Sequence, residues 1–179
     1  MSKFAVFLRG VNVGGVKVLM KDLSQLLLSA GFTEVKTLLA SGNVVLSSEE
    51  SDPQIIQATC NELLATHYQR EIPTLVYTAE EIKELSGPFG MPLPDPVAEH
   101  HCYLTLCQSE DDALAMGEAI KTLDDSRELL IIGRAICWIV SKGTSTTDPV
   151  AKLIQAQAKR RIITTRNHNT LVKIAKIVG

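Results

Sequence analysis

The same order of predicted elements occurs twice along this chain of 179 residues. In each half, short apolar runs typical of strands alternate with longer segments of helical periodicity, in the order strand, helix, strand, strand, helix, strand. Residue by residue, the two halves do not repeat each other. This order is that of the split βαβ, or ferredoxin-like, unit. The sequence therefore predicts an α+β protein of two tandem ferredoxin-like (βαββαβ) units with antiparallel sheets.

Turn and cap residues mark where these elements begin and end. Gly31 ends a helix with regularly spaced leucines, and Asp52-Pro53 and Asp148-Pro149 are typical helix starts with proline at the first helical position. Tight turns are expected at 41–43 and 133–134. The expected strands cover residues 4–8, 35–40, 43–47, 72–77, 101–107, 128–132, 135–140 and 162–165.

A proline-rich segment separates the two halves. Between Pro88 and Pro96, four of nine residues are proline, which excludes regular structure. A capping box from Thr78 to Glu81 predicts a short helix just before this segment, and an amphipathic helix ends the chain. We expect a first unit with a linker helix at 1–86, a connection at 87–98, and a second unit with a C-terminal helix at 99–179.

Composition narrows the class of protein. The chain is 45% hydrophobic and 21% charged, which is ordinary for a globular protein. No segment approaches the length of a membrane span, and the apolar run before Arg9 is too short for a signal peptide. We therefore expect a cytoplasmic protein without a membrane partner. Nothing in the sequence indicates its oligomeric state.

The spacing of cysteine and histidine gives no metal or nucleophile motif. The four cysteines form no C-x-x-C pair, which predicts buried reduced thiols in place of disulfides or a zinc site. His100, His101 and Cys102 are adjacent, so in a strand they alternate between its two faces. The motifs H-E-x-x-H and G-x-S-x-G do not occur. We expect no metal and no cofactor, and the catalytic residues of any reaction are unknown.

A glycine-rich polar loop follows the first strand and is the first candidate site. Glycine just past a strand lets a ligand approach the backbone closely, and the N-terminus of the next helix offers free N–H groups to an anion. In a βαββαβ unit this loop lies at the same end of the sheet as the turn between the second and third strands. The candidate ligand-binding residues here are Arg9, Gly10, Asn12, Gly14, Gly15, Ser41, Gly42 and Asn43.

A second polar set, Thr165, Arg166 and Asn167, precedes the last helix. By the same argument on chain direction, this set shares an edge with the loop at 141–147, which is rich in serine and threonine. Hydroxyl groups and basic side chains around two helix N-termini suit a phosphate or a carboxylate. The same residues are also typical of a solvated loop and of simple helix caps.

Three segments together resemble a bacterial family of domains of unknown function. They read LRGVNVGG from Leu8, SGNVV from Ser41 and TRNxNT from Thr165, and the match spans nearly the whole chain. The resemblance implies a duplicated ferredoxin-like fold and a site at these segments, but no reaction. The family usually carries tryptophan where this chain has His168, and Tyr-Ile-Gln where it has Leu38-Leu39-Ala40.

Charge is distributed unevenly along the chain. The segment at 149–179 has seven basic residues and no acidic one, although the net charge of the chain is −2. Such a segment indicates either an anionic ligand or docking of one half on the other. RNA-recognition modules stack bases on aromatic residues of central strands; of the strands at 43–47 and 135–139, only the second has one, Trp138, and a lone tryptophan there is typical of a core.

These observations favour a protein that binds a small anionic or nucleotide-like ligand at its loops rich in glycine, asparagine and arginine. Arg9 and Arg166 would meet the negative charge, and Asn12, Asn43 and Asn167 would donate hydrogen bonds. Three alternatives stay open: nucleic-acid binding through the basic C-terminal segment, an enzyme of unknown reaction at the same loops, and a protein-interaction module.

Overall fold

A computed structural model of the chain describes residues 1–12, 16–91 and 97–179. The chain divides into two compact units: unit 1 comprises Met1–Lys83 and Lys173–Gly179, and unit 2 comprises Glu84–Val172. The described ranges contain eight strands and six α-helices. None of the helices in these ranges has both the length and the apolar character that a membrane span requires.

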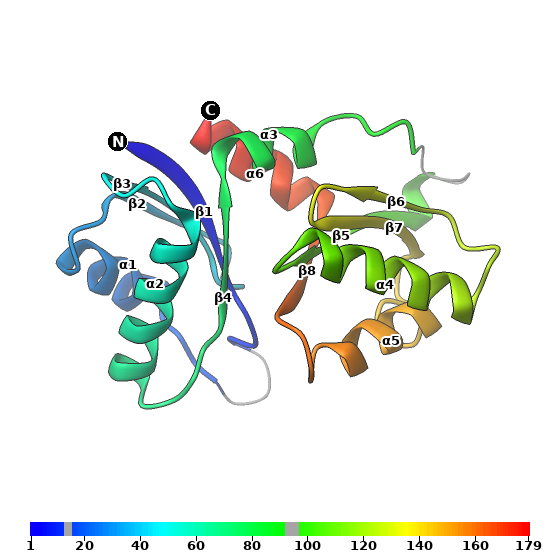
Figure 1. The fold of residues 1–179 in the computed structure, drawn as a ribbon, viewed down its shortest axis with the longest axis horizontal. Coiled ribbons are helices and arrows are strands. Elements are labelled where there is room, and N and C mark those ends of the chain that lie inside the picture. The colour runs from blue at the N-terminus through cyan, green and yellow to red at the C-terminus, as the bar shows by residue number, and fades with distance from the viewer. Residues whose placement is uncertain (13–15, 92–96) are drawn as a thin grey trace. The chain divides into compact units, whose positions relative to one another are not determined.

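Unit 1 contains a four-stranded antiparallel sheet with the strand order β2-β3-β1-β4 (Figure 1). Helices α1 and α2 cover one face of this sheet. In chain order its elements are β1 (Ser2–Leu8), α1 (Met20–Ser29), β2 (Thr33–Leu38), β3 (Asn43–Ser48), α2 (Pro53–Tyr68), β4 (Thr74–Thr78) and the first part of α3 (Ala79–Ser86).

Unit 2 contains a second four-stranded antiparallel sheet, with the order β6-β7-β5-β8. Helices α4 and α5 cover one of its faces. Its elements are the 3₁₀-helix η1 (Val97–Glu99), β5 (His100–Cys107), α4 (Glu110–Leu123), β6 (Leu129–Ile132), β7 (Ala135–Ser141), α5 (Pro149–Gln157), β8 (Ile163–Asn167) and the start of α6 (His168–Val178). The predicted α+β class with antiparallel sheets is therefore confirmed.

The central strand of unit 1 explains the uninterrupted apolar run near the N-terminus. Phe4, Val6 and Leu8 of β1 pack in the core under α1 and α2. The intervening Phe7 is also fully buried, and its ring meets Tyr77 edge to face at 5.9 Å between centroids. A strand that is buried on both faces carries a continuous apolar sequence instead of an alternating one.

The predicted helix starts are confirmed by their caps. The Asp52 carboxylate accepts a hydrogen bond from the Gln54 backbone N–H at 2.8 Å, and proline follows it at the first helical position. Thr78 and Glu81 form the predicted capping box: each side chain accepts from the other residue's backbone N–H. Each cap satisfies backbone donors that have no partner inside the helix.

Three boundaries differ from those expected. Strand β2 ends at Leu38 and not at Ala40, because Leu39 has a φ of 58° and leaves the extended conformation. Strand β8 extends to Asn167, so the polar residues before the last helix lie in a strand and not in a loop. Helix α6 starts in unit 2, but its last residues from Lys173 belong to unit 1, where the Lys3 ammonium donates to the Ile177 carbonyl. Helical periodicity shows that a helix has an apolar face, but not which core receives it.

Candidate functional site

The loop after β1 and the turn before β3 lie together in unit 1. The Leu8 backbone N–H donates to the Gly42 carbonyl at 2.8 Å, and the Arg9 N–H donates to the Pro73 carbonyl at 3.0 Å. Gly42 has a φ of +75°, and a Cβ added there would lie 2.8 Å from the Leu8 Cβ. The two candidate segments are therefore adjacent, as the topology predicts. Gly14 and Gly15 lie outside the described residues.

The asparagines of this region form hydrogen bonds within the loops. The Asn12 carboxamide accepts from the Val18 N–H at 3.0 Å and donates to the Val18 and Ala40 carbonyls. The fully buried Asn43 donates to the Leu38 carbonyl at 3.1 Å and to the Ser41 hydroxyl at 2.8 Å. Asn12 thus ties its loop to the turn before β3, and Asn43 closes that turn. Both amides therefore hold backbone in place, and the ligand contacts expected of them stay a prediction.

The second candidate set is divided between the two faces of β8. The Thr165 hydroxyl lies 2.9 Å from that of Thr105, and the Asn167 amide lies 3.3 Å from Nδ1 of His101. Arg166 lies between them in the strand and therefore on the opposite face. Its guanidinium donates to the Thr164 hydroxyl at 2.6 Å. Because a strand alternates its side chains, Arg166 and Asn167 do not share a face.

Arg166 is held in the structure by its own strand. Besides Thr164, its guanidinium donates to the Thr165 carbonyl at 3.1 Å. Burial lowers the pKa of Arg166 to about 10, because the charged guanidinium loses contact with water. The side chain is still cationic near neutral pH. The arrangement supplies a fixed positive charge on the face of β8 opposite to Asn167.

Unit 2 contains a cavity of about 540 Å³, formed by residues that the structure describes. Three short segments line it: residues 87–91, 100–102 and 167–169. Its volume lies in the range typical of small-molecule sites. The wall combines aromatic, imidazole, amide and thiol groups, and its described residues include no acidic side chain.

His168 is the first residue of α6 and lies in the wall of this cavity. Its ring meets that of Phe89 edge to face, with 5.0 Å between centroids. Its Nε2 atom is buried and has no hydrogen-bond partner among the described residues. A buried polar atom without a partner costs about 1–3 kcal/mol. A ligand that supplied this hydrogen bond would recover that cost.

Asn167 links the cavity wall to the start of α6. Its carboxamide oxygen accepts from the Asn169 backbone N–H at 2.9 Å, which caps the helix. Its amide nitrogen lies 3.3 Å from His101 Nδ1. Asn167 is thus the one residue of the expected site that lines this cavity.

The sequence prediction missed Phe89, His101 and Cys102, which line the cavity with His168. Phe89 was expected in a featureless connection, and the adjacent His101 and Cys102 were considered only as metal ligands. The described residues contain no group of three or more histidine, cysteine or acidic side chains placed to hold a metal. One signal in the sequence pointed to this wall: the chain has His168 where the family usually carries tryptophan, and His168 lines the cavity.

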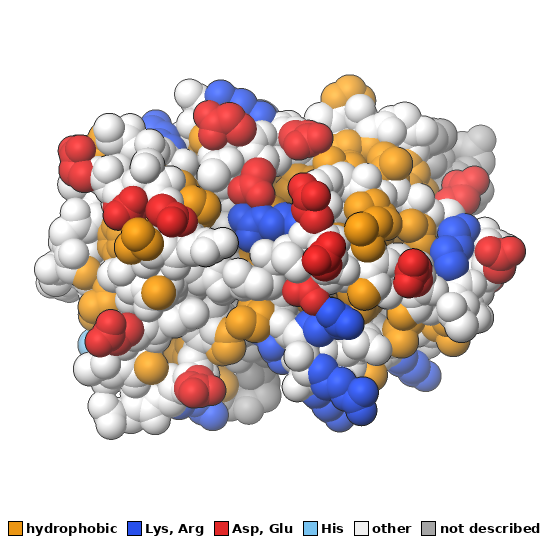
Figure 2. Space-filling view, in the orientation of Figure 1, with side chains coloured by type: hydrophobic (Ala, Val, Ile, Leu, Met, Phe, Trp, Pro, Cys, Tyr) orange, Lys and Arg blue, Asp and Glu red, His pale blue; other side chains and the backbone are white. Residues whose placement is uncertain are grey.

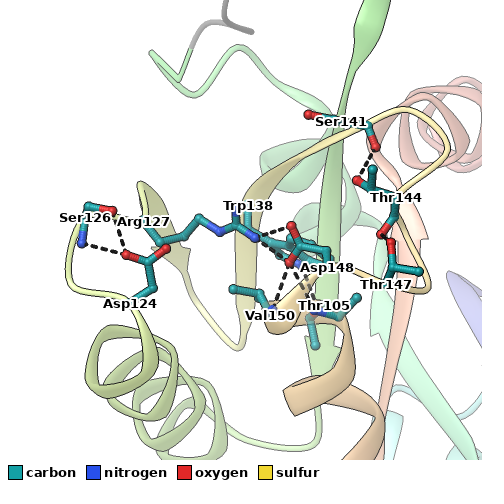
Figure 3. A network of polar contacts seen from close by, with 11 residues as sticks. Thr105, Asp124, Ser126, Arg127, Trp138, Ser141, Thr144, Thr147, Asp148 and Val150 are labelled. Carbon is teal, nitrogen blue, oxygen red and sulfur yellow. Dashed lines mark hydrogen bonds and ion pairs between the residues drawn. The ribbon is translucent and has the colours of Figure 1, made fainter.

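Figure 3 shows a polar network in unit 2 whose labelled residues are not among those that line this cavity. Arg127 donates to both carboxylate oxygens of Asp148, and Asp148 also caps α5 through the Val150 N–H at 2.8 Å. The Trp138 indole N–H donates to the buried Thr105 hydroxyl at 3.0 Å. Trp138 is 2% exposed, so it is a core residue, as expected, and is closed to base stacking.

The basic C-terminal segment is partly engaged within unit 2. Arg161, just beyond α5, forms an ion pair with Asp112 of α4, and Arg166 donates within β8 as described. Acidic and basic side chains both occur on the face drawn in Figure 2. Part of the positive charge of this segment is therefore already paired within unit 2. Fewer of its basic side chains are left to bind the phosphates of a nucleic acid.

Comparison with known proteins agrees with this architecture. The structure of the conserved bacterial protein SP0830 from Streptococcus pneumoniae matches with a TM-score of 0.72 and 26% sequence identity, over 99% of each chain. An unknown protein from Galdieria sulphuraria matches with a TM-score of 0.28 and 12% identity, over 93% of this chain and 96% of that one. No curated protein matches.

The family comparison covers most of the chain. Residues 1–138 match the model described as "Protein of unknown function (DUF1697)". This range includes β1, the turn before β3, strand β5 of unit 2 and the first part of β7, up to Trp138. The resemblance to a family of unknown function is thereby confirmed; the third motif, at 165–170, lies beyond the matched residues. The chain belongs to the DUF1697 family of proteins of unknown function.

Proposed function

We propose that the cavity of unit 2 binds a small anionic ligand that carries a ring, of about the size of a nucleotide. The observation that carries the proposal is the composition of the wall: histidine, asparagine and phenylalanine without an acidic side chain among the described lining residues. Such a wall repels no anion, and the Phe89 and His168 rings offer apolar contact. The cavity volume of about 540 Å³ suits a ligand of this size.

The start of α6 supports the anionic character of the ligand. The first turn of a helix carries partial positive charge, and α6 begins at His168 in the cavity wall. This partial charge acts together with the absence of acidic side chains in the described wall, so both features favour an anion over a cation.

The test is thermal unfolding against nucleotides, sugar phosphates and aromatic carboxylates. A ligand at about one hundred times its dissociation constant adds about 2.7 kcal/mol, or several degrees for a chain of this length. His168→Phe keeps the ring contact with Phe89 and removes Nε2, so affinity should fall about tenfold. His67→Phe, at an exposed position of unit 1, is the control and should leave affinity unchanged. Equal affinities of the two variants would contradict the proposal.

The loops of unit 1 are the second candidate, favoured by the contacts of Leu8 and Val11, which flank Arg9 and Gly10, with Gly42 in the turn before β3. Here Asn12 and Asn43 would hold the loops, while the Arg9 guanidinium and the backbone of Gly10 would meet the anion. Arg9→Ala distinguishes the two candidates in the same assay. A ligand whose binding depends on Arg9 and not on His168 would assign the site to unit 1.

We also propose that each unit is a ferredoxin-like domain and that the chain arose by duplication. The support is that the two sheets have the same topology: when the strands of each unit are numbered along the chain, the first strand lies between the third and the fourth in the sheet. The cytoplasmic location expected from the sequence stays a prediction.

A further inference from the structure

The sulfur atoms of Cys102 and Cys137 are neighbours on one face of the second sheet. Cys102 lies in β5 and Cys137 in β7, and the register pairs Cys102 with Ile139 and Leu104 with Cys137. The two cysteines are therefore diagonal neighbours on adjacent strands. Their Sγ atoms are 2.7 Å apart. Only a small movement separates this contact from a covalent sulfur–sulfur bond of about 2.05 Å.

The two thiols differ in access. Cys102 is half-buried and lines the cavity of unit 2, whereas Cys137 is fully buried. A small polar reagent that enters the cavity therefore meets Cys102 first. Cys137 lies directly behind it.

The contact also shifts the pKa values of the two thiols in opposite directions. The hydrogen bond from the Cys137 thiol lowers the pKa of Cys102, against the opposing effect of burial. The same contact and burial raise the pKa of Cys137. Burial raises the pKa of Cys60 and of Cys107 to about 12. Since the thiolate is the reactive form, Cys102 is the nucleophile of the set.

We propose that Cys102 and Cys137 are a peroxide-reactive pair that closes to a disulfide between β5 and β7. The Cys102 thiolate attacks hydrogen peroxide, the oxygen–oxygen bond breaks, and the departing hydroxide takes up a proton to become water. The sulfenic acid on Cys102 then reacts with the Cys137 thiol, forming the sulfur–sulfur bond and a second water. The two thiols lose two electrons and two protons, and the peroxide is reduced. This inference is independent of the proposed ligand.

The experiment treats the reduced full-length chain with a small excess of hydrogen peroxide, alkylates it in denaturant and measures the intact mass. We expect loss of two alkylatable thiols and of the mass of two hydrogen atoms, with one cross-linked peptide containing Cys102 and Cys137. Dithiothreitol should restore all four thiols of the chain. Alkylation of native protein by iodoacetamide should begin at Cys102, at a pH below that of an ordinary thiol.

Matched variants identify the roles. Cys102→Ala should slow peroxide consumption about tenfold, while Cys107→Ala, a fully buried position of the same strand, should leave it unchanged. In Cys137→Ala the reaction should stop at a Cys102 sulfenic acid that dimedone traps. Trp138 fluorescence reports whether each variant is folded. The proposal is overturned by four free thiols after peroxide, by a disulfide containing Cys60 or Cys107, or by over-oxidation of Cys102 beside a reduced Cys137.

Discussion

Replacing Gly42 by alanine is expected to destabilise unit 1 by about 3 kcal/mol. Two effects add. The φ of +75° at Gly42 is the left-handed region, where a side chain costs about 1–2 kcal/mol. The new Cβ would also lie 2.7 Å from a Val11 methyl and 2.8 Å from the Leu8 Cβ. The Leu8 Cβ is fixed to its backbone, which the hydrogen bond from the Leu8 N–H to the Gly42 carbonyl holds in place.

The control for this variant is Gly10→Ala in the adjacent loop. Gly10 has a similar φ of +69°, but among the described residues no atom beyond its chain neighbours lies within 4 Å of an added Cβ. We expect this variant to lose only about 1 kcal/mol, from backbone strain alone. Hydrogen exchange of β1 and β3 peptides, with β5 and β7 peptides as internal reference, measures both losses. Equal losses would mean that Leu8 and Val11 yield to the new methyl group and that the close approach is not required.

The Gly42 contact shows what the motif SGNVV encodes. From the sequence, Gly42 and Asn43 favoured a tight turn, with a ligand contact as the alternative. In the structure Gly42 is needed where two backbones meet, and the buried Asn43 closes the turn. Local residue types predicted the turn itself. The close approach depends on β1, which is far away in sequence, and no local pattern encodes such a contact.

The elements of both units were predicted well because their signals are local. The caps at Asp52, Thr78 and Asp148 are short-range hydrogen bonds, so the residue types alone indicate them. Strand β8 was predicted less well: its end at 165–167 is polar and lacks the apolar alternation of a strand. Pairing with β5, through Thr105 and Thr165 among others, extends it to Asn167.

The cavity of unit 2 was not predictable in the same way. Its wall combines residues 87–91, 100–102 and 167–169, which are separated along the chain and meet only in the folded unit. The contact of Cys102 with Cys137 has the same origin, because it depends on the register of β5 with β7. Register is set by the whole sheet and its turn, and a shift by one residue would move Cys102 to the other face.

Replacing Asp148 by alanine is expected to destabilise unit 2 by about 3 kcal/mol. The Asp148 side chain is 10% exposed and accepts from Arg127 with both carboxylate oxygens. Its removal leaves a mostly buried guanidinium without its counter-charge, and the Nε of Arg127 already lacks a partner among the described residues. The variant also loses the α5 cap, in which the Val150 and Ala151 N–H groups donate to Asp148.

Companion variants separate the charge of Asp148 from its cap. Asp148→Asn keeps an oxygen for the cap and should lose less, about 2 kcal/mol. Arg127→Met removes the charge that Asp148 would leave unpaired, so the double variant with Asp148→Ala should lose about 2 kcal/mol less than the sum of the single losses. Urea unfolding followed by Trp138 fluorescence measures all four, because Trp138 is the only tryptophan of the chain and lies in the core of unit 2. Additive losses would show that the ion pair contributes nothing beyond the cap. The predicted coupling instead makes the Arg127–Asp148 pair a contact that joins the segment before β6 to the start of α5, whose apolar residues Val150 and Ile154 pack in the core of unit 2.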